Sequence, residues 1–211
     1  MSIQIECASK SYGKQMVLQD ISAEFKRGMI SGIIGRNGSG KTVLLKCICS
    51  LTPLDSGRIA IFGKELGRDI FRPESLGAII NEPGFLPSYS GYRNLSMIAS
   101  IKRQIRKEQI KETMRLVGLD PESRKWVCKY SMGMKQRLGI AQAIMENPDL
   151  LILDEPMNGL DNRGVDDMRK LFLELKGQGK TILLASHNRE DIEILCDHVY
   201  EMDAGRLTQM R

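Results

Sequence analysis

The octapeptide "GRNGSGKT", Gly35–Thr42, decides how the rest of the sequence is interpreted. It fits G-x-x-x-x-G-K-[ST], the pattern of a phosphate-binding loop, at every constrained position. A short apolar stretch at 29–34 precedes it, and a helical pattern follows at 41–51. In this setting the glycines let backbone N–H groups curl around phosphate oxygens, and the helix points its positive end at them. An accidental glycine-rich turn is therefore disfavoured.

The loop gives individual residues an expected role. Lys41 is expected to reach the β- and γ-phosphates of a nucleotide, and Thr42 to ligate Mg²⁺ through its hydroxyl. The expected nucleotide-binding residues of the loop are Asn37, Gly38, Ser39, Gly40, Lys41 and Thr42.

A second motif, "LLILDEP" at 150–156, places two carboxylates after an apolar strand. Ligands of open α/β sheets bind at the carboxyl ends of the strands. Asp154 is suited to hold Mg²⁺ and Glu155 to orient or deprotonate an attacking water. An acid pair that merely caps a strand is common, but the phosphate-binding loop in the same chain makes the functional interpretation strong.

The third motif is "YSMGMKQRLGIAQAIMENP", residues 130–148. Ser131 is a plausible N-cap, Gly133 allows close backbone approach, and a helix of about 13 residues, some 20 Å long, follows. Since its far end leads to the strand of Asp154, we expect the Ser131 end to lie away from the chain's own loop. It could serve the nucleotide of another copy, although the local sequence alone favours an ordinary capped helix.

The order of elements predicts an α/β fold. Buried apolar strands alternate with helices, which indicates a parallel sheet covered on both faces. Alternating strands at the N-terminus, with Ile3, Ile5 and Cys7 on one face, indicate an added antiparallel piece, and a closing hairpin is expected over Ala204-Gly205. Residues 87–148 look like a helical insertion. Within it, "IKRQIRKEQIK" at 101–111 is predicted to be one amphipathic helix with a basic face.

Composition excludes several other classes. The chain has 211 residues with 5% aromatics and a net charge of +5, which leaves no aromatic platform for stacking many bases. Its five cysteines include no CxxC pair, and free buried thiols are expected for Cys47 and Cys49, as in a reducing compartment. Two histidines make a Cys/His zinc site improbable. With no signal peptide or membrane span expected, the chain should be cytosolic.

Together these motifs resemble the nucleotide-binding subunits of ABC transporters over essentially the whole chain. The stretch at 130–137 is similar to the family signature LSGGQ-x-Q-R. It keeps the signature residues Ser131, Gly133, Gln136 and Arg137. It departs from the signature at Tyr130, Met132 and Met134.

Three further residues match positions of the family. "MNGLD" at 157–161 resembles the D-loop and ends at Asp161. His187 in "LLASHN" matches the switch histidine, and Tyr12 in "SYG" matches the aromatic residue that stacks on adenine. Each has a plainer alternative, because a lone Tyr is often half-buried and a strand-end His is often simply satisfied. Their roles rest on the resemblance.

The resemblance implies a P-loop NTPase (RecA-like) core with a mostly parallel sheet, an antiparallel β subdomain and an inserted α-helical subdomain. Residues 1–86 and 149–211 would form the ATP-binding core and 87–148 the helical signature subdomain. Two copies, or this chain and a second ABC ATPase, would enclose two ATP molecules with Mg²⁺, each between one loop and the partner's Ser131 and Gly133. Integral membrane permease subunits, but no nucleic acid, would be partners, and the chain would lie in the cytoplasm on the inner face of the membrane.

The stretch "LGAIINEP" at 76–83 stands where the family has a strand that ends in a metal-sensing glutamine. If Pro83 fixes the register, Asn81 takes that position and keeps the amide. If the register slips by one, Glu82 takes it. Asn81 or Glu82 is therefore expected to sense Mg²⁺ and the γ-phosphate, unless both are simply a frayed strand end.

The subgroup and the rival functions follow from finer features. "GAIINEPGFLP" and the signature region are most similar to the bacitracin-resistance and lantibiotic-immunity peptide exporters, of which this chain looks like a minimal form. A non-transport ABC ATPase of the translation or DNA-repair type is the alternative, but those types fuse two cassettes or insert a long coiled coil. A GTP switch would need N-K-x-D, which is missing. A scaffold without hydrolysis is disfavoured by Glu155.

Overall fold

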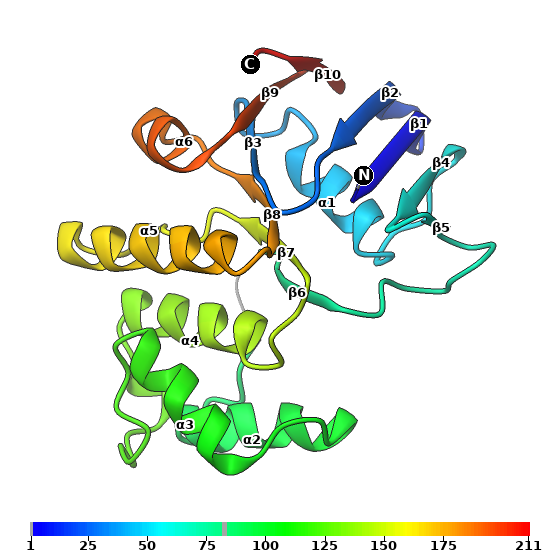
Figure 1. Ribbon diagram of the computed structural model, residues 1–211. Helices are drawn as coiled ribbons and strands as arrows, with labels where there is room; N and C mark the ends of the chain where they lie inside the picture. Colours follow the sequence, from blue (N-terminus) through cyan, green and yellow to red (C-terminus); the bar gives the residue numbers. More distant parts are fainter. Residues whose placement is uncertain (1, 82–83) are drawn as a thin grey trace.

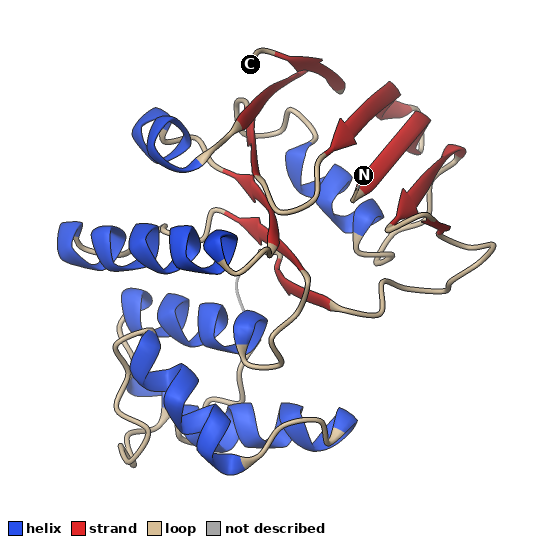
Figure 2. Cartoon of the chain, viewed as in Figure 1, coloured by secondary structure: helices blue, strands red, loops and turns tan. Residues whose placement is uncertain are grey.

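A six-stranded sheet forms the centre of the chain in the computed structural model, which describes residues 2–81 and 84–211. Its strand order is β10-β9-β3-β8-β7-β6, and β6, β7, β8, β3 and β9 run parallel. These strands are β3 (Ile30–Ile34), β6 (Leu76–Ile79), β7 (Leu150–Asp154), β8 (Thr181–Ala185), β9 (His198–Asp203) and β10 (Arg206–Gln209). The predicted, mostly parallel sheet is confirmed, and β9 and β10 form the predicted hairpin (Figures 1 and 2).

The central strands separate two apolar cores. Every residue of β7 and β8 is buried, as expected for parallel strands covered on both faces. Leu151 and Leu153 of β7 face the core beneath the helices, whereas Leu150 and Ile152 face the core that contains α1 (Lys41–Ile48). This alternation is the two-residue period of a strand.

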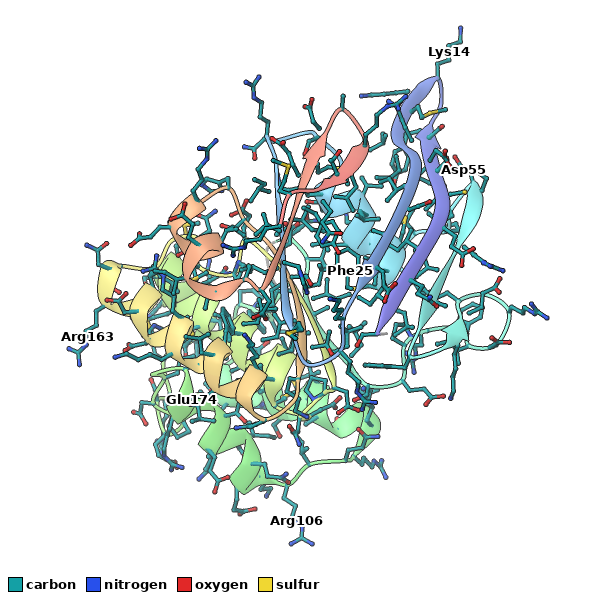
Figure 3. The ribbon with its side chains drawn as sticks, turned by 45° about the horizontal axis from the view of Figure 1, so that its top comes forward. Lys14, Phe25, Asp55, Arg106, Arg163 and Glu174 are labelled. Atoms are coloured by element: carbon teal, nitrogen blue, oxygen red, sulfur yellow. The ribbon has the colours of Figure 1, made fainter. Side chains whose placement is uncertain are left out.

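A second sheet of four antiparallel strands packs beside α1. Its order is β2-β1-β4-β5, with β1 (Ile3–Tyr12), β2 (Gln15–Phe25), β4 (Ser56–Ile61) and β5 (Lys64–Glu65). Figure 3 shows Phe25 inside this part of the molecule, where it is 1% exposed, and Lys14 at the outer tip of the β1–β2 hairpin.

The predicted inward alternation of Ile3, Ile5 and Cys7 was wrong at its third position. Cys7 is exposed with φ 49°, and the register with β2 shifts between Ile5 and Ala8, so that Ala8 is buried instead. An extra residue in one strand of an antiparallel pair forms a bulge and reverses the faces that follow. The bulge therefore puts Cys7 in solvent.

The helical insertion contains α2 (Gly91–Lys102), α3 (Lys107–Leu116), the single 3₁₀ turn η1 (Val127–Lys129) and α4 (Met132–Ile144). The prediction of one helix over 101–111 was wrong. Arg103 has φ 55° and ends α2, and the backbone N–H of Arg106 donates to Oε1 of Gln109 at 2.9 Å where α3 begins. Ile101 is 80% exposed, whereas Ile110 is buried.

Tertiary packing explains this break. The turn lets α3 fold back against α2, which buries Ile110 in the core beneath the sheet. A straight helix rises about 1.5 Å per residue and would carry Ile110 away from that core. Arg106 at the turn points outward (Figure 3).

The helix α4 lies directly against β6. An ideal Cβ built on Gly77 would lie 1.9 Å from the carbonyl oxygen of Ala143, so only glycine allows the two backbones to approach this closely. The sheet is completed on its helical side by α5 (Asn162–Gly177) and α6 (Arg189–Leu195). Within the described part of the chain, no helix is long and apolar enough to span a membrane.

Candidate active site

The phosphate-binding loop follows β3 and leads into α1. Gly35, Gly38 and Gly40 have φ values of 154°, 81° and 114°, the last two in the left-handed region that glycine adopts without strain. Lys41 is 6% exposed, and its ammonium donates to the carbonyl oxygens of Gly35 at 2.7 Å and Arg36 at 3.1 Å. The loop thus curls around its own lysine, which is held at the base of the loop.

One polar atom of the loop has no partner in the described structure. Ser39 is 8% exposed and its Oγ forms no hydrogen bond. Because buried hydroxyls are normally satisfied, this atom marks a position where a polar ligand fits. Asn37 and Gly38 beside it are exposed. The loop therefore fits the anionic phosphates that its sequence predicts.

The turn of the β9–β10 hairpin contacts the phosphate-binding loop. The backbone N–H of Gly205 donates to the Ser39 carbonyl oxygen at 3.0 Å, and its carbonyl oxygen accepts from the Gln19 N–H at 2.8 Å. An ideal Cβ on Gly205 would lie 2.6 Å from the Val17 carbonyl oxygen. The sequence predicts this hairpin, but no local signal predicts that it holds the phosphate-binding loop.

Thr42 and Asp154 meet across the end of β7. The Thr42 hydroxyl donates to Oδ2 of Asp154 at 2.6 Å, and Asp154 is 8% exposed. A hydroxyl and a carboxylate are the hard oxygen ligands that Mg²⁺ prefers alongside phosphate oxygens. The two residues predicted to hold the metal are thus adjacent, and they fit it.

Glu155 and His187 form a second pair next to the first. Nδ1 of His187 lies 2.8 Å from Oε2 of Glu155, with side chains 64% and 25% exposed respectively. Glu155 has φ 49°, a left-handed conformation that costs a non-glycine residue about 1–3 kcal/mol. Such strain persists only where surrounding contacts fix the backbone.

Gln136 of α4 supplies part of that fixation. Its Nε2 donates to the carbonyl oxygens of Glu155 at 3.2 Å and Pro156 at 2.8 Å, while the Glu155 N–H donates to the Ala185 carbonyl oxygen at 2.9 Å. The sequence motif assigns no contact to Gln136, and this contact links α4 to the acid pair.

A cleft of about 530 Å³ contains the phosphate-binding loop and the acid pair, whereas the predicted residues Ser39 and His187 are not part of its described lining. Of the predicted residues, it is lined by Asn37, Gly38, Gly40, Lys41, Thr42, Asn81, Asp154 and Glu155. Val17, Val43, Met132, Gln136 and Asn158 complete the lining without having been predicted.

The predicted metal-sensing and adenine-stacking residues are placed as follows: Asn81 is in the cleft, Glu82 is outside the described residues, and Tyr12 is outside the described lining. Asn81 lies on its wall with φ 61°, a conformation that Asn tolerates better than most residues. Glu82, the alternative to Asn81, lies outside the described residues together with Pro83. Tyr12 is 51% exposed at the end of β1 and is not part of the described lining, but Nζ of Lys10 lies 5.7 Å from its ring centroid.

Three of the retained signature residues, Ser131, Gly133 and Arg137, line a different hollow of about 790 Å³. Ser131 is the N-cap of α4, because its Oγ accepts from the Met134 N–H at 3.2 Å, and Gly133 and Asp161 share the hollow with it. The predicted cap is therefore confirmed. Met132 lines both cavities, so the first residue of α4 borders the cleft of the phosphate-binding loop, although the sequence predicted that this end of the helix lies away from the loop.

A parallel sheet with a phosphate-binding loop after β3 and an acid pair after β7 defines the class of P-loop nucleoside triphosphatases. The ABC transporter family model matches residues 18–158. The chain belongs to the ABC transporter family, as an ATP-binding subunit with ATPase function.

Curated relatives are similar in sequence to this chain over almost its whole length. It is 43% identical to an uncharacterized ABC transporter ATP-binding protein of Bacillus subtilis (strain 168), over 97% of this chain and 94% of that protein. It is 39% identical to the bacitracin transport ATP-binding protein BcrA of Enterococcus faecalis, over 98% of this chain and 68% of that protein. It is 34% identical to the lantibiotic transport ATP-binding protein SrtF of Streptococcus pyogenes, over 97% of this chain and 88% of that protein. The predicted family and subgroup are confirmed.

Solved structures show the same fold. An ATP-binding subunit of an ABC transporter superposes with a TM-score of 0.88 at 26% identity, over 100% of this chain and 90% of that one. A dimeric ATP-binding cassette in a post-hydrolysis state, bound to ADP and Pi, superposes with a TM-score of 0.89 at 20% identity, over 99% of both chains. The predicted core with its antiparallel and helical parts is confirmed.

Proposed function

We propose that this chain hydrolyses ATP to drive a membrane exporter of a peptide antibiotic or a similar amphipathic compound. Residues 1–86 and 149–211 would serve as the ATP-binding core and 87–148 as the helical signature subdomain. The observation that carries the proposal is the cleft that Lys41, Thr42, Asp154 and Glu155 line together, with Thr42 hydrogen-bonded to Asp154 and His187 in contact with Glu155.

The phosphates of ATP would bind at the start of α1. The loop N–H groups and the N-terminus of α1 attract the anion, and Lys41 exchanges its carbonyl partners for phosphate oxygens. The Ser39 hydroxyl gains a partner. The adenine would stack on Tyr12, whose ring is half exposed.

Mg²⁺ would be held by Thr42 and Asp154, with Asn81 or Glu82 near it, and when bound it supplies charge neutralisation of the β- and γ-phosphates. The 2.6 Å contact between Thr42 and Asp154 supports this ligand pair. The position of Asn81 on the cleft wall supports its part in the set.

Glu155 would orient and deprotonate the attacking water. A carboxylate at the end of β7, fixed by Gln136 and β8, accepts the water proton while the P–O bond to ADP breaks. His187 would hold Glu155 and contact the γ-phosphate, whose charge the lysine and loop stabilise in the transition state. Most of the rate gain would come from positioning and electrostatics.

The second half of each ATP site would come from a partner, either a second copy or another ABC ATPase. Ser131 and Gly133 at the N-terminus of α4, with Asp161, line a hollow distinct from the chain's own cleft. The capped N-terminus of α4, a helix of 13 residues, is a suitable anion site. The two subunits would close around ATP and separate again after hydrolysis, and this movement would drive transport.

The step would pass to permease subunits through the groove beside the 87–100 region, with the chain in the cytoplasm at the inner face of the membrane. A cavity of about 250 Å³ lies there, lined by Phe85, Pro87, Val127, Cys128, Met132, Lys135 and Gln136. Because Met132 and Gln136 also line the ATP cleft, the two sites share a wall. The transport names of the relatives favour an exported peptide antibiotic over a nucleic-acid partner.

The catalytic assignment is tested by the steady-state ATPase rate of the wild type and of Glu155→Gln. Loss of a general base typically costs about 10²–10⁴-fold, so the rate should fall by at least about 100-fold while ATP still binds. Glu112→Gln, an exposed change on α3, is the matched control and should hydrolyse ATP normally. Equal rates for wild type and Glu155→Gln would refute the assignment.

The partner is tested by affinity purification from membranes. An integral membrane protein that co-purifies with the chain supports the exporter. Ribosomes or DNA in its place would favour the alternative, a translation or DNA-repair ATPase.

A further inference from the structure

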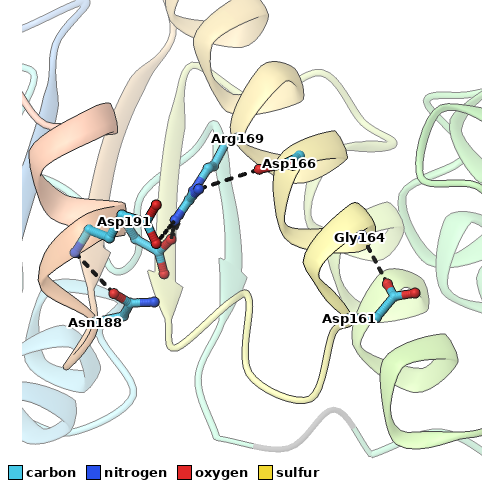
Figure 4. Close-up of polar contacts among 7 residues, drawn as sticks. Asp161, Gly164, Asp166, Arg169, Asn188 and Asp191 are labelled. Carbon is cyan, nitrogen blue, oxygen red and sulfur yellow. Dashed lines mark hydrogen bonds and ion pairs between the residues drawn. The ribbon is translucent and has the colours of Figure 1, made fainter.

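A buried ion pair joins α5 to the first turn of α6 (Figure 4). Nε and Nη2 of Arg169 donate to Oδ1 of Asp191 at 2.9 and 2.6 Å, and Nη2 also lies 3.1 Å from Oε2 of Glu190. Asp191 is 2% exposed and the Arg169 side chain 11%. Exposed pairs are mobile and weak, but a buried, doubly bonded guanidinium fixes the relative position of two elements.

The two ends of α6 are held in different ways. The helix has only seven residues, too few to be stable without tertiary contacts. Its later residues pack on β3, where an ideal Cβ on Gly32 would lie 2.7 Å from Sγ of Cys196 and 2.8 Å from Cδ1 of Ile192. Its first turn is held by the Asn188 cap, which accepts from the Glu190 N–H at 3.0 Å, and by Arg169.

His187 directly precedes this first turn. Its side chain is 64% exposed, so packing contributes little to the position of its ring. The next residue, Asn188, caps α6, and its own N–H donates to Oγ of Ser186 at 3.1 Å. A displacement of the first turn of α6 would therefore move His187 away from its 2.8 Å contact with Glu155.

The other end of α5 lies at the second hollow. Asp161 caps α5 by accepting from the Gly164 N–H at 2.9 Å (Figure 4). It also lines the hollow together with Ser131 and Gly133. Arg169 lies eight residues further on, about 12 Å along the axis at 1.5 Å per residue. One helix thus connects Asp161, which lines the second hollow, with Arg169, which holds the first turn of α6.

We propose that Arg169 is a positioning residue, which sets His187 against Glu155 and couples that contact to the Asp161 end of α5. The proposal rests on the proposed function, because it assumes that His187 assists hydrolysis. It adds a route by which engagement of a partner at Asp161 reaches the catalytic pair of the same chain.

The activity test uses the full chain and a double-mutant cycle. Arg169→Met/Asp191→Asn removes both charges, so that no unpaired carboxylate stays buried. It should lower kcat about 10- to 100-fold, the loss expected from a misplaced catalytic group, and change KM for ATP less than about twofold. In a His187→Ala background the same change should lower kcat no further.

Lys176→Met is the matched control, because Lys176 is also on α5 and pairs with Asp197 beyond the far end of α6. Its kcat should stay within about twofold of wild type. If Arg169→Met/Asp191→Asn lowers kcat by the same factor with and without His187, the effect is general and the proposal is overturned. Arg169→Lys, which keeps the charge but loses the planar fork, replaces the double variant if circular dichroism shows that the latter does not fold.

A structural readout separates this proposal from the proposed function. The sequence has only two histidines, so the ring ¹H–¹³C NMR signal of His187 is identified by its loss in His187→Ala. The signal should move in the Arg169 variants and stay in place in Lys176→Met. An unmoved signal overturns the proposal. A moved signal supports the positioning link, and if His187→Ala then retains full kcat, it is the catalytic role of His187 that fails.

Discussion

Replacing Gly77 by alanine tests how closely α4 must lie against the sheet. The new Cβ would lie 1.9 Å from the Ala143 carbonyl oxygen and 2.9 Å from Cδ2 of Leu151. Real Cβ atoms essentially never come within 3.0 Å of such atoms, so β6 and α4 must separate by about 1.1 Å. The clash is with backbone, which has no rotamer to escape through.

The expected cost follows from this geometry. Forcing extra volume into a packed core costs about 1–3 kcal/mol, and the reduced freedom of the unfolded chain offsets about 0.4–1 kcal/mol of it. The midpoints of these two ranges leave a net cost of about 1.3 kcal/mol, which lowers Tm by about 3–5 °C at about 2–4 °C per kcal/mol for a domain of this size. ATPase activity should fall too, because α4 carries Gln136 to the Glu155 backbone.

The assay is thermal unfolding followed by circular dichroism, with urea unfolding as the second measurement. Gly177→Ala is the control, since it makes the same chemical change at the end of α5 where no atom lies within 4 Å of the new Cβ. Its Tm should be unchanged or slightly raised, because alanine favours helix. A Gly77→Ala protein as stable as wild type would show that α4 and β6 are not in tight contact.

Two further predictions concern the catalytic loop and the thiols. Gln136→Leu removes two hydrogen bonds to the backbone of Glu155 and Pro156. It should lower the free energy of unfolding in urea by about 1–3 kcal/mol and should also lower kcat. Unchanged kcat and stability would contradict the support assigned to Gln136. Burial raises the pKa of Cys47 to about 11 and of Cys49 and Cys196 to about 12, so in an Ellman assay at pH 8 only the exposed Cys7 and Cys128 should react before unfolding. The three buried thiols should gain reactivity only as the pH approaches their raised pKa, and a third fast thiol in the folded chain would be the opposite result.

Local pattern predicted most elements because each depends on residues close together in the chain. The apolar runs of β7 and β8 read as buried strands, and both are fully buried. The pattern failed where packing between distant segments overrides periodicity. The bulge at Cys7 and the turn at Arg103 both reverse which side chains face the core. Neither contains a glycine or proline from which the sequence could predict it.

The sequence by itself determined the phosphate-binding loop, the acid pair and their meeting at one edge of the sheet. Both motifs follow strands of a predicted parallel sheet, and the carboxyl ends of such strands share an edge. It also determined the Ser131 cap, which depends on a contact three residues away.

Only the tertiary structure decided what holds that site in place. Gly205 supports the loop at Ser39, Gln136 fixes Glu155, and Arg169 secures the turn after His187. The residues in contact are 19 apart for Gln136 and Glu155, 22 apart for Arg169 and Asp191, and 166 apart for Ser39 and Gly205. No spacing rule in the sequence encodes them, because they arise only when separate helices and strands pack on one sheet.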